Sequence, residues 1–394
     1  MILCTAAKVC VAMKPIFLCW CVTECYKTVR ALTLKKEILI KIKALWEDAL
    51  TMNVNLKQLA EMLGLSQTTV SRALNGYPEV NAETRQRVLS AVRDTGYRPN
   101  RAAQRLATGR AGSIGLVMPI AQGIDSDVHF GEFLAGLGEE SVRHDFHFVI
   151  NPSAPDDEEA TFKRLAASGN VDALFLAYVR ANDPRIAMLK SLSIPFVVHG
   201  RAIGQAADYP FLDIDNTGAF YDATRLLIQL GHRRIALING PGNLTFSIRR
   251  AKGMRRALEE NGMTLDESLV HNSLMTDEYG HRAMQQFLDS ERPPTAVLCS
   301  STVIALGAVR AINKAGLQIG SDISLIAHDD VLPMLKPENF SVPLTTTRSS
   351  LRAAGSRIAT RLISRILKTG DYPDQELWRT ELIVRASTGP AARS

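Results

Sequence analysis

The segment from Ser66 to Asn75 holds the polar side chains with the clearest chemical potential. Its sequence, SQTTVSRALN, places Val70, Ala73 and Leu74 at helical spacing, which leaves amides, hydroxyls and one arginine on the opposite face. A face of this kind, without an acid, suits the donors and acceptors that base pairs display in the major groove of DNA. The residues expected to point outward are Gln67, Thr68, Ser71, Arg72 and Asn75.

Short helices should surround and position this polar face. Apolar residues recur at helical spacing over 56–63, and Gly64 can take the positive φ that ends many helices. Asn81 can cap a third helix, which Gly96 would end. A further short helical pattern over 101–108 follows a proline. The residues from 52 to 112 are therefore predicted to form a small helical unit with a linker.

The rest of the chain alternates between apolar runs and amphipathic stretches. This alternation predicts parallel strands covered by helices on both faces, and the number of units favours two lobes over one sheet. Ligands of such sheets bind at the carboxyl ends of the strands, here in a cleft between the lobes. The predicted strands are SIGLVMP, FHFVI, ALFLAY, IPFVVHG, RIALING, TAVLCS, ISLIAHD and ELIVRA.

Charge is distributed unevenly along the chain, whose formal net charge is +6. Residues 52–112 contain nine Lys and Arg against four Asp and Glu, and residues 1–51 contain eight against four. The remainder is mildly acidic. Positive charge therefore gathers near the predicted helical unit, as contact with phosphates requires.

Cysteine usage and hydropathy argue against a metal site and a membrane span. Five of the six cysteines lie in the first 25 residues, without a CxxC pair or a nearby histidine cluster. A body with one cysteine fits a reducing cytoplasm. The run PIFLCWCV is too short to cross a bilayer, which needs about 20 apolar residues, and it lacks a cleavage site for export.

Residues 1–51 are interpreted as a non-native or disordered N-terminal extension, with Met52 as the natural start, because Met52 stands just before the first helical residues. The alternative is a genuine accessory tail.

Three consecutive segments, GLSQTTVSRALNG, VNAETR and GYRPNRAAQRLATG, resemble the helix-turn-helix and hinge of the lactose-repressor (LacI/GalR) family. The resemblance continues through LGHRRIALING, RRAKGMRRALEENG, IAHDD and VPLTTTR, and it covers essentially everything after Met52. The stretch SDVHFGEFLAGLGEESVRHDFHFVI is most similar to regulators of α-glucoside uptake operons.

This resemblance implies a small all-helical headpiece and a two-lobed, doubly wound parallel α/β core like that of periplasmic binding proteins. The helix-turn-helix domain would span 52–99, the hinge helix and linker 100–112, and the effector-binding and dimerisation core 113–394. Within the core, lobe one would take 113–231 and 349–372, and lobe two 232–348 and 373–394. LGHRRIALING would mark the first crossing between the lobes.

The resemblance also implies how the headpiece contacts DNA. Gln67, Thr68 and Arg72 would read bases, with Arg72 presenting its fork to guanine and Gln67 pairing with adenine. Leu106, together with Ala103, would enter the minor groove from the hinge. The residues expected to contact the DNA backbone are Ser71, Asn75, Asn81, Thr84, Tyr97 and Asn100. Asn81 has the alternative role of a helix cap alone.

Arg and Asp offer the paired donors and acceptors that a polyhydroxylated sugar needs. The family pattern places ligand-binding residues at Asp127, Phe130, Arg250, Ser301 and Asp329. Arg250 could instead pair with a surface acid, Asp329 could cap a turn, and Phe130 could be core. Ser301 and Thr302 stand where the family usually has an Asn-Asp pair, so the identity of the sugar does not carry over.

The predicted function is a sequence-specific transcriptional repressor that a small carbohydrate releases from its operator, controlling genes of sugar uptake or catabolism. The alternatives are a ligand-activated co-repressor or activator, and a sugar-binding protein without a regulatory role. An enzyme is not expected, because HExxH, GxSxG and P-loop motifs are absent and His232 and His328 look structural.

The predicted protein requires no cofactor or metal and has no membrane partner. It would act as a homodimer on a pseudo-palindromic operator, because a hinge helix this short needs its twin and the DNA. Its expected location is the bacterial cytoplasm, at the nucleoid.

Overall fold

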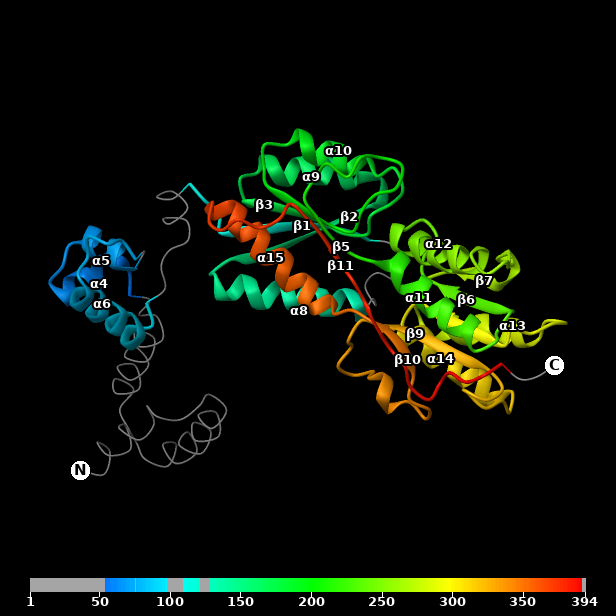
Figure 1. The fold of residues 1–394 in the computed structure, drawn as a ribbon. Helices are drawn as coiled ribbons and strands as arrows, with labels where there is room; N and C mark the ends of the chain where they lie inside the picture. The colour runs from blue at the N-terminus through cyan, green and yellow to red at the C-terminus, as the bar shows by residue number, and fades with distance from the viewer. Residues whose placement is uncertain (1–53, 75, 98–108, 121–127, 392–394) are drawn as a thin grey trace, which may run out of the picture. The chain divides into compact units, whose positions relative to one another are not determined.

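The computed structural model describes residues 54–74, 76–97, 109–120 and 128–391. The chain divides into two compact units between Gln104 and Arg105, which are a helical headpiece and an α/β body. Figure 1 draws both units.

The headpiece helices begin and end at the residues whose chemistry predicts it. Asn55 and Gln58 form a capping box, and Gly64 ends the first helix at φ 64°. The Ser66 hydroxyl accepts from the Thr69 amide at 3.0 Å, and Asn81 caps the third helix. The helices are α4 (Leu56–Leu63), α5 (Gln67–Leu74) and α6 (Ala82–Thr95). Their common core includes Leu59, Val70, Val88 and Tyr97.

The first lobe of the body is built on a six-stranded parallel sheet in the order β11-β5-β4-β3-β1-β2. Its strands are β1 (Ser113–Pro119), β2 (His147–Ser153), β3 (Ala173–Leu176), β4 (Phe196–His199), β5 (Phe211–Ile214) and β11 (Gln375–Trp378). Helices α8 (Val128–Arg143) and α15 (Leu351–Leu367) cover one face, and α9 (Glu158–Ala167) and α10 (Pro184–Ser191) cover the other (Figure 1).

The second lobe repeats this design in the order β12-β10-β9-β8-β6-β7, with only β12 antiparallel. Its strands are β6 (Ile235–Asn239), β7 (Val270–Asn272), β8 (Ala296–Cys299), β9 (Ser324–Asp329), β10 (Thr345–Arg348) and β12 (Glu381–Ile383). Its helices are α11 (Asn216–Gln229) and α12 (Thr245–Glu259) on one face, and α13 (Asp277–Leu288) and α14 (Thr302–Lys314) on the other. Short 3-10 turns lie at Pro155–Asp157, Glu267–Leu269 and Pro337–Asn339.

The chain passes between the lobes three times within this body. It crosses after β5 into α11, after β10 into α15, and between β11 and β12. The crossings are tied by backbone bonds, since the Asp215 amide donates to the Trp378 carbonyl at 2.8 Å and the Ser349 amide to the Asp329 carbonyl at 3.0 Å.

The predicted lobe limits were wrong at two elements. Helix α11, expected in lobe one, packs against α12 and belongs to lobe two, so the first crossing precedes α11 and not the segment LGHRRIALING. Strand β11, expected in lobe two, pairs with β5 in lobe one. An amphipathic pattern reveals that a helix or strand has a buried face, but it does not reveal which sheet covers that face.

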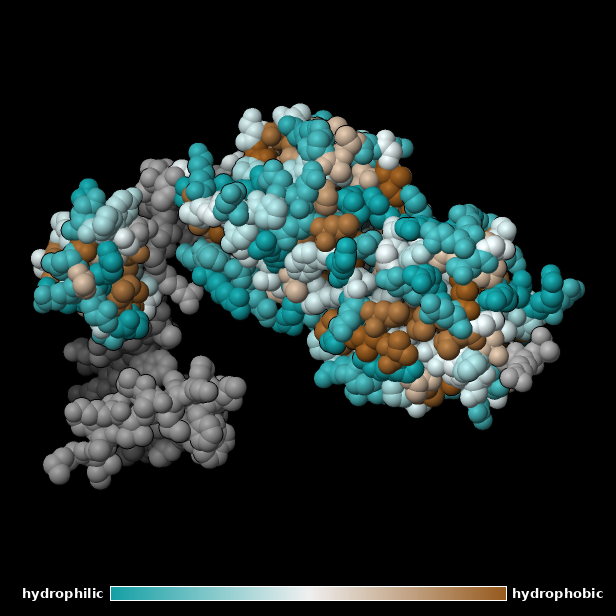
Figure 2. All heavy atoms as spheres, viewed as in Figure 1, coloured by the Kyte–Doolittle hydropathy of each residue, from teal (hydrophilic) through white to brown (hydrophobic). Residues whose placement is uncertain are grey.

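Apolar side chains are also exposed on the second lobe. Leu306 on α14 and Met334 in the loop after β9 are exposed, and Figure 2 shows hydrophobic residues gathered on the visible face of this lobe.

Candidate functional site: the headpiece face and the cleft of the body

The polar face of α5 lies at the headpiece surface. Val70 and Ala73 are buried, whereas Gln67, Thr68 and Arg72 are exposed on the other side of the same helix. An amide, a hydroxyl and a guanidinium are therefore presented together, with no acid among the residues of α5. These groups can form hydrogen bonds with base edges.

The residues predicted to contact the DNA backbone differ in how exposed their side chains are. Ser71 and Thr84 are half-buried, and Asn81 is exposed while its side chain accepts from the Thr84 amide at 2.7 Å. Tyr97 is only 7% exposed and lies in the headpiece core, where burial raises the pKa of its hydroxyl. The structure thus places Tyr97 in a packing role.

Several predicted residues lie outside the described residues. They are Asn75, Asn100, Ala103, Leu106 and Asp127, together with the extension 1–51 and the helix expected over 101–108.

A cavity of about 130 Å³ lies between the two lobes of the body. Lobe one contributes aromatic walls from α8 and the end of β3, and lobe two contributes polar and aromatic groups from α12 and the end of β9. The lining includes Phe130, Phe133, Tyr178, Phe246, Arg250 and Asp330. This space is called the cleft cavity below.

Arg250 is the most firmly held cation of the cleft cavity. Its Nε donates to Asn216 Oδ1 at 2.7 Å and its Nη1 to the Ser300 carbonyl at 2.5 Å. The guanidinium lies over the rings of Phe220 and Phe246, 5.2 and 4.9 Å from their centroids. Burial lowers the pKa of Arg250 to about 10, so it remains charged at neutral pH. Two of its five N–H groups are used in these bonds, while the side chain also lines the cavity.

Asp330 provides the acidic side of the cleft cavity. It lies 3.4 Å from His328 Nε2 and 3.6 Å from His129 Nε2. Burial alone would raise the pKa of Asp330, but His328, His129 and Arg250 overcome this and hold it below its usual value. A fixed carboxylate and a fixed guanidinium therefore face the same cavity.

The sequence assigned this role to Asp329, and the structure corrects it by one residue. Asp329 accepts from the Val331 amide at 2.8 Å and lies 3.5 Å from Arg348 Nε, outside the cavity lining. Burial raises the pKa of Asp329. Side chains of successive residues point to opposite sides at a strand end, so Asp330 faces the cleft when Asp329 does not.

The other two predicted cleft residues behave differently from each other. Phe130 lines the cavity and also packs on Phe133 and Tyr178, with ring centroids 6.3 and 5.4 Å apart. Ser301 is fully buried and caps α14 by accepting from the Ile304 amide at 3.1 Å, without lining the cavity. It shapes the site only through its neighbour Ser300, whose carbonyl holds Arg250.

Sequence reasoning missed several polar groups of the lining. Asn216 orients Arg250, and Asp213 accepts from Arg201 Nε at 2.8 Å. His199 also lines the cavity, and burial lowers its pKa. The signal was present, since each of these residues stands at or just beyond a strand end, where the cleft of such a body lies.

Neither a metal-binding cluster nor a membrane-spanning helix is found in the part of the chain that the structure describes. No group of three or more His, Cys, Asp or Glu side chains among those residues is arranged to hold a metal ion. Within the same residues, none of the helices is both long and apolar enough to cross a membrane.

Family models match both parts of the chain. Residues 55–100 match the bacterial regulatory proteins of the lacI family, and residues 224–388 match a periplasmic binding protein-like domain.

Relatives align over most of their length. The chain is 82% identical over 340 residues to the HTH-type transcriptional regulator AglR of Rhizobium meliloti (strain 1021), covering 86% of this chain and 96% of the relative. It is 31% identical over 334 residues to the HTH-type transcriptional regulator CelR of Thermobifida fusca, covering 84% and 97%.

Solved structures show the same architecture. A complex of the transcriptional regulator CelR with cellobiose superposes with a TM-score of 0.62 at 30% identity, covering 84% of this chain and 99% of that one. The lac repressor dimer bound to operator and the anti-inducer ONPF superposes with a TM-score of 0.71 at 25% identity, covering 85% and 99%. With a helical headpiece, a two-lobed body and relatives matched along nearly their whole length, this chain belongs to the lacI family of bacterial regulatory proteins.

Proposed function

We propose that this protein is a transcriptional repressor that leaves its operator when a small carbohydrate binds in the cleft cavity. The observation that carries this proposal is Arg250, a buried cation held by hydrogen bonds and aromatic rings at the wall of the cleft cavity. The same chain presents an acid-free polar helix, α5, on its headpiece.

On DNA, Gln67, Thr68 and Arg72 read base edges from the major groove, and Ser71 and Thr84 contact phosphates. Asn81 combines its helix cap with a phosphate contact. Asn75, Asn100, Ala103 and Leu106 keep the roles that the family resemblance gives them.

The protein acts as a homodimer on a pseudo-palindromic site in the bacterial cytoplasm, at nucleoid DNA. The exposed apolar side chains of lobe two, such as Leu306, provide surface for a second copy. The lac repressor structure that the chain resembles is a dimer.

In the cleft, Arg250 and Asp330 bind hydroxyl groups of the sugar, while Phe130, Tyr178 and Phe246 contact its apolar ring faces. Asp127 keeps the ligand-binding role that the family resemblance gives it. The stretch SDVHFGEFLAGLGEESVRHDFHFVI is similar to regulators of α-glucoside uptake operons, and we assign α-glucosides as the effector class. Effector and DNA influence each other through the relative position of the lobes, and this coupling is reciprocal.

The test is fluorescence-anisotropy titration of the full-length protein with DNA from its own upstream region, with and without maltose, trehalose and sucrose. One of these sugars is expected to weaken binding to a palindromic site and to leave non-specific DNA binding unchanged. If a sugar strengthens operator binding instead, the protein is a co-repressor. Absence of any site preference would contradict the proposal.

Arg72→Lys tests base reading in the same assay. Lysine keeps the charge but loses the two-pronged hydrogen bond, so specific affinity should fall by about ten- to a hundredfold while non-specific affinity stays. Arg93→Lys is the matched control, since Arg93 is an exposed arginine on α6. Equal behaviour of the two variants would show that Arg72 does not read a base.

A further inference from the structure

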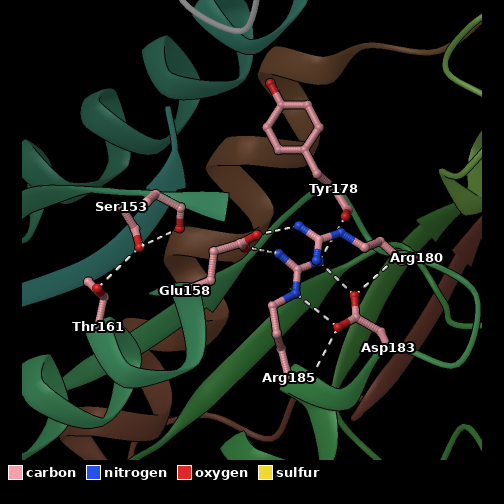
Figure 3. Close-up of polar contacts among 8 residues, drawn as sticks. Ser153, Glu158, Thr161, Tyr178, Arg180, Asp183 and Arg185 are labelled. Carbon is pink, nitrogen blue, oxygen red and sulfur yellow. Dashed lines mark hydrogen bonds and ion pairs between the residues drawn. The ribbon is translucent and has the colours of Figure 1, made fainter. Parts of the chain in front are cut away.

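Four charged side chains meet beyond the end of β3, on the side of the first sheet that α9 and α10 cover (Figure 3). Arg185 donates to both oxygens of Asp183, at 2.9 and 2.6 Å, and to Glu158 Oε2 at 2.5 Å. Arg180 pairs with the other oxygen of Glu158. Arg185, Asp183 and Glu158 are almost completely buried. We call these four residues the charge cluster.

The charge cluster holds the backbone of the segment between β3 and α10. Arg185 Nη2 donates to the Tyr178 carbonyl at 2.8 Å, and the Arg180 amide donates to Asp183 Oδ2 at 3.0 Å. Tyr178 and Asn182 both have positive φ, 52° and 49°. Asn adopts this conformation readily, whereas a tyrosine does so only when its surroundings enforce it, and the bond from Arg185 to the Tyr178 carbonyl is one such restraint.

This segment is also one of the places where lobe one contacts α12, the helix that bears Arg250. The Thr245 amide at the start of α12 donates to the Val179 carbonyl at 2.9 Å, and Arg180 forms an antiparallel backbone bridge with Leu244. Tyr178, Val179 and Thr245 all line the cleft cavity. The backbone that the charge cluster holds therefore bonds to the other lobe at the edge of the cleft cavity.

Stability alone does not account for the charge cluster. Burying the three charges of Glu158, Asp183 and Arg185 costs desolvation energy, and well-packed apolar residues would often serve the fold as well. Burial alone would raise the pKa of Asp183, but its bonds with Arg185 overcome this and lower it. The ion pairs hold the four side chains in fixed orientations, and these side chains in turn orient the backbone at the cleft.

We propose that the charge cluster is a positioning device: it holds Val179 and Arg180 in place for Leu244 and Thr245, and so sets how tightly the cleft closes on its ligand. This inference rests on the proposed function, in which the ligand is a sugar bound in the cleft cavity. None of the four charged side chains lines that cavity, so they act through the backbone.

The first test compares Arg180→Met with Arg164→Met in the full-length protein. Arg180 is partly exposed, and methionine keeps much of its stem, so the fold should persist. Arg164 is an exposed arginine on α9 whose ion pair is with Asp157, outside the charge cluster. Calorimetric titration with maltose, trehalose or sucrose, whichever the wild type binds, should show affinity about tenfold weaker for Arg180→Met and unchanged for Arg164→Met.

The second test removes the donor on the other lobe. Thr245 is the first residue of α12, a position where proline is tolerated, so Thr245→Pro deletes one N–H and spares the helix. Thr245→Ala keeps that N–H and controls for the lost side chain. Affinity should fall more for proline than for alanine. The double variant Arg180→Met/Thr245→Pro should bind sugar no more weakly than the single variant with the lower affinity. Both changes disrupt the same contact between the lobes, so their effects should not add.

Hydrogen exchange tests the positioning without any sugar. The Thr245 amide should exchange about tenfold faster in Arg180→Met than in the wild type, while amides inside α13 are unchanged. If exchange and sugar affinity are both unaffected, the inference is wrong. If the wild type binds none of the sugars but Thr245 exchange responds, the contact is real and the proposed effector class is what fails.

Discussion

At the scale of the residue, the cleft depends on how one buried cation is held. Arg250 is fixed by Asn216, by the Ser300 carbonyl and by two aromatic rings. A guanidinium fixed before binding loses little entropy when a ligand arrives, so more of the interaction energy appears as affinity.

Replacement of Arg250 should therefore weaken effector binding strongly, although the side chain is buried. Arg250→Met is expected to lower sugar affinity by about ten- to a hundredfold, because a charged hydrogen bond is worth about 1.5–3 kcal/mol. Isothermal titration calorimetry measures this directly. Arg256→Met, an exposed arginine on the same helix paired with Glu260, should bind sugar as the wild type does. Similar losses in both variants would rule out a direct role for Arg250.

The same scale shows where sequence reasoning was limited. Arg250 and Phe130 could be found from motif position and residue type, and both line the cavity. Asp329 and Asp330 could not be told apart, because adjacent acids at a strand end differ only in the direction in which their side chains point. The Ser301 hydroxyl caps α14, and residue type alone does not reveal this role.

At the scale of the element, helix pairs in both lobes pack backbone to backbone through glycine. A Cβ on Gly136 of α8 would lie 1.9 Å from the Arg352 carbonyl of α15, and one on Gly253 of α12 would lie 2.2 Å from the Thr217 carbonyl of α11. Gly307 of α14 meets the Asp277 carbonyl of α13 in the same way. The obstacle is a backbone carbonyl in each pair, so the helices themselves would have to move apart.

Two glycines on α8 should therefore respond oppositely to alanine. Gly136→Ala is expected to lower the free energy of unfolding by about 1–3 kcal/mol, because it forces α8 and α15 apart. Gly138→Ala meets no atom within 4 Å and should raise it by about 1 kcal/mol through helix propensity. Urea unfolding followed by circular dichroism gives both values. A stabilising effect at Gly136 would show that α8 and α15 are not packed this closely.

Elements were predictable from sequence where a helix cap or an apolar run marks them. The capped headpiece helices and strands such as β1, β6 and β9 match the predicted segments. Strands β5, β7, β10 and β11 have three or four residues each and were not predicted as strands. Strands β3, β4 and β8 are equally short but stand in apolar runs. The missed strands contain polar residues (FLDI, VHN, TTTR and QELW), and their strand character comes from pairing with distant partners.

At the scale of the whole molecule, acid should destabilise the body. Burial lowers the pKa of His199, His232 and His328, so the folded state favours their neutral forms. As the pH falls below about 6.5, the unfolded chain takes up protons that the folded chain resists. The lowered pKa of Asp330 acts in the same direction at lower pH.

The expected loss is on the order of 1–3 kcal/mol between pH 7.5 and pH 5. Thermal midpoints at a series of pH values measure it, and His232→Gln should flatten the slope in addition to lowering stability. His232 serves this purpose because it lies away from the cleft, bonded to Thr295 and Ser324. A protein that became more stable on acidification would contradict the prediction.

The two-lobed class of the body was predictable from alternation, but its division was not. Which sheet receives α11 and β11 depends on contacts between residues far apart in the sequence. Periodicity within a segment contains no information about such partners.

The three crossings also determine the order in which the protein can mature on the ribosome. The headpiece core comes from residues 54–97 alone, so it can fold early in synthesis. Neither lobe shares this freedom. The first lacks α15 and its edge strand β11, and the second lacks β12, until residues 351–383 have been made. A nascent chain therefore acquires its DNA-contacting surface long before the body that governs it, and both lobes are completed together in the last moments of translation.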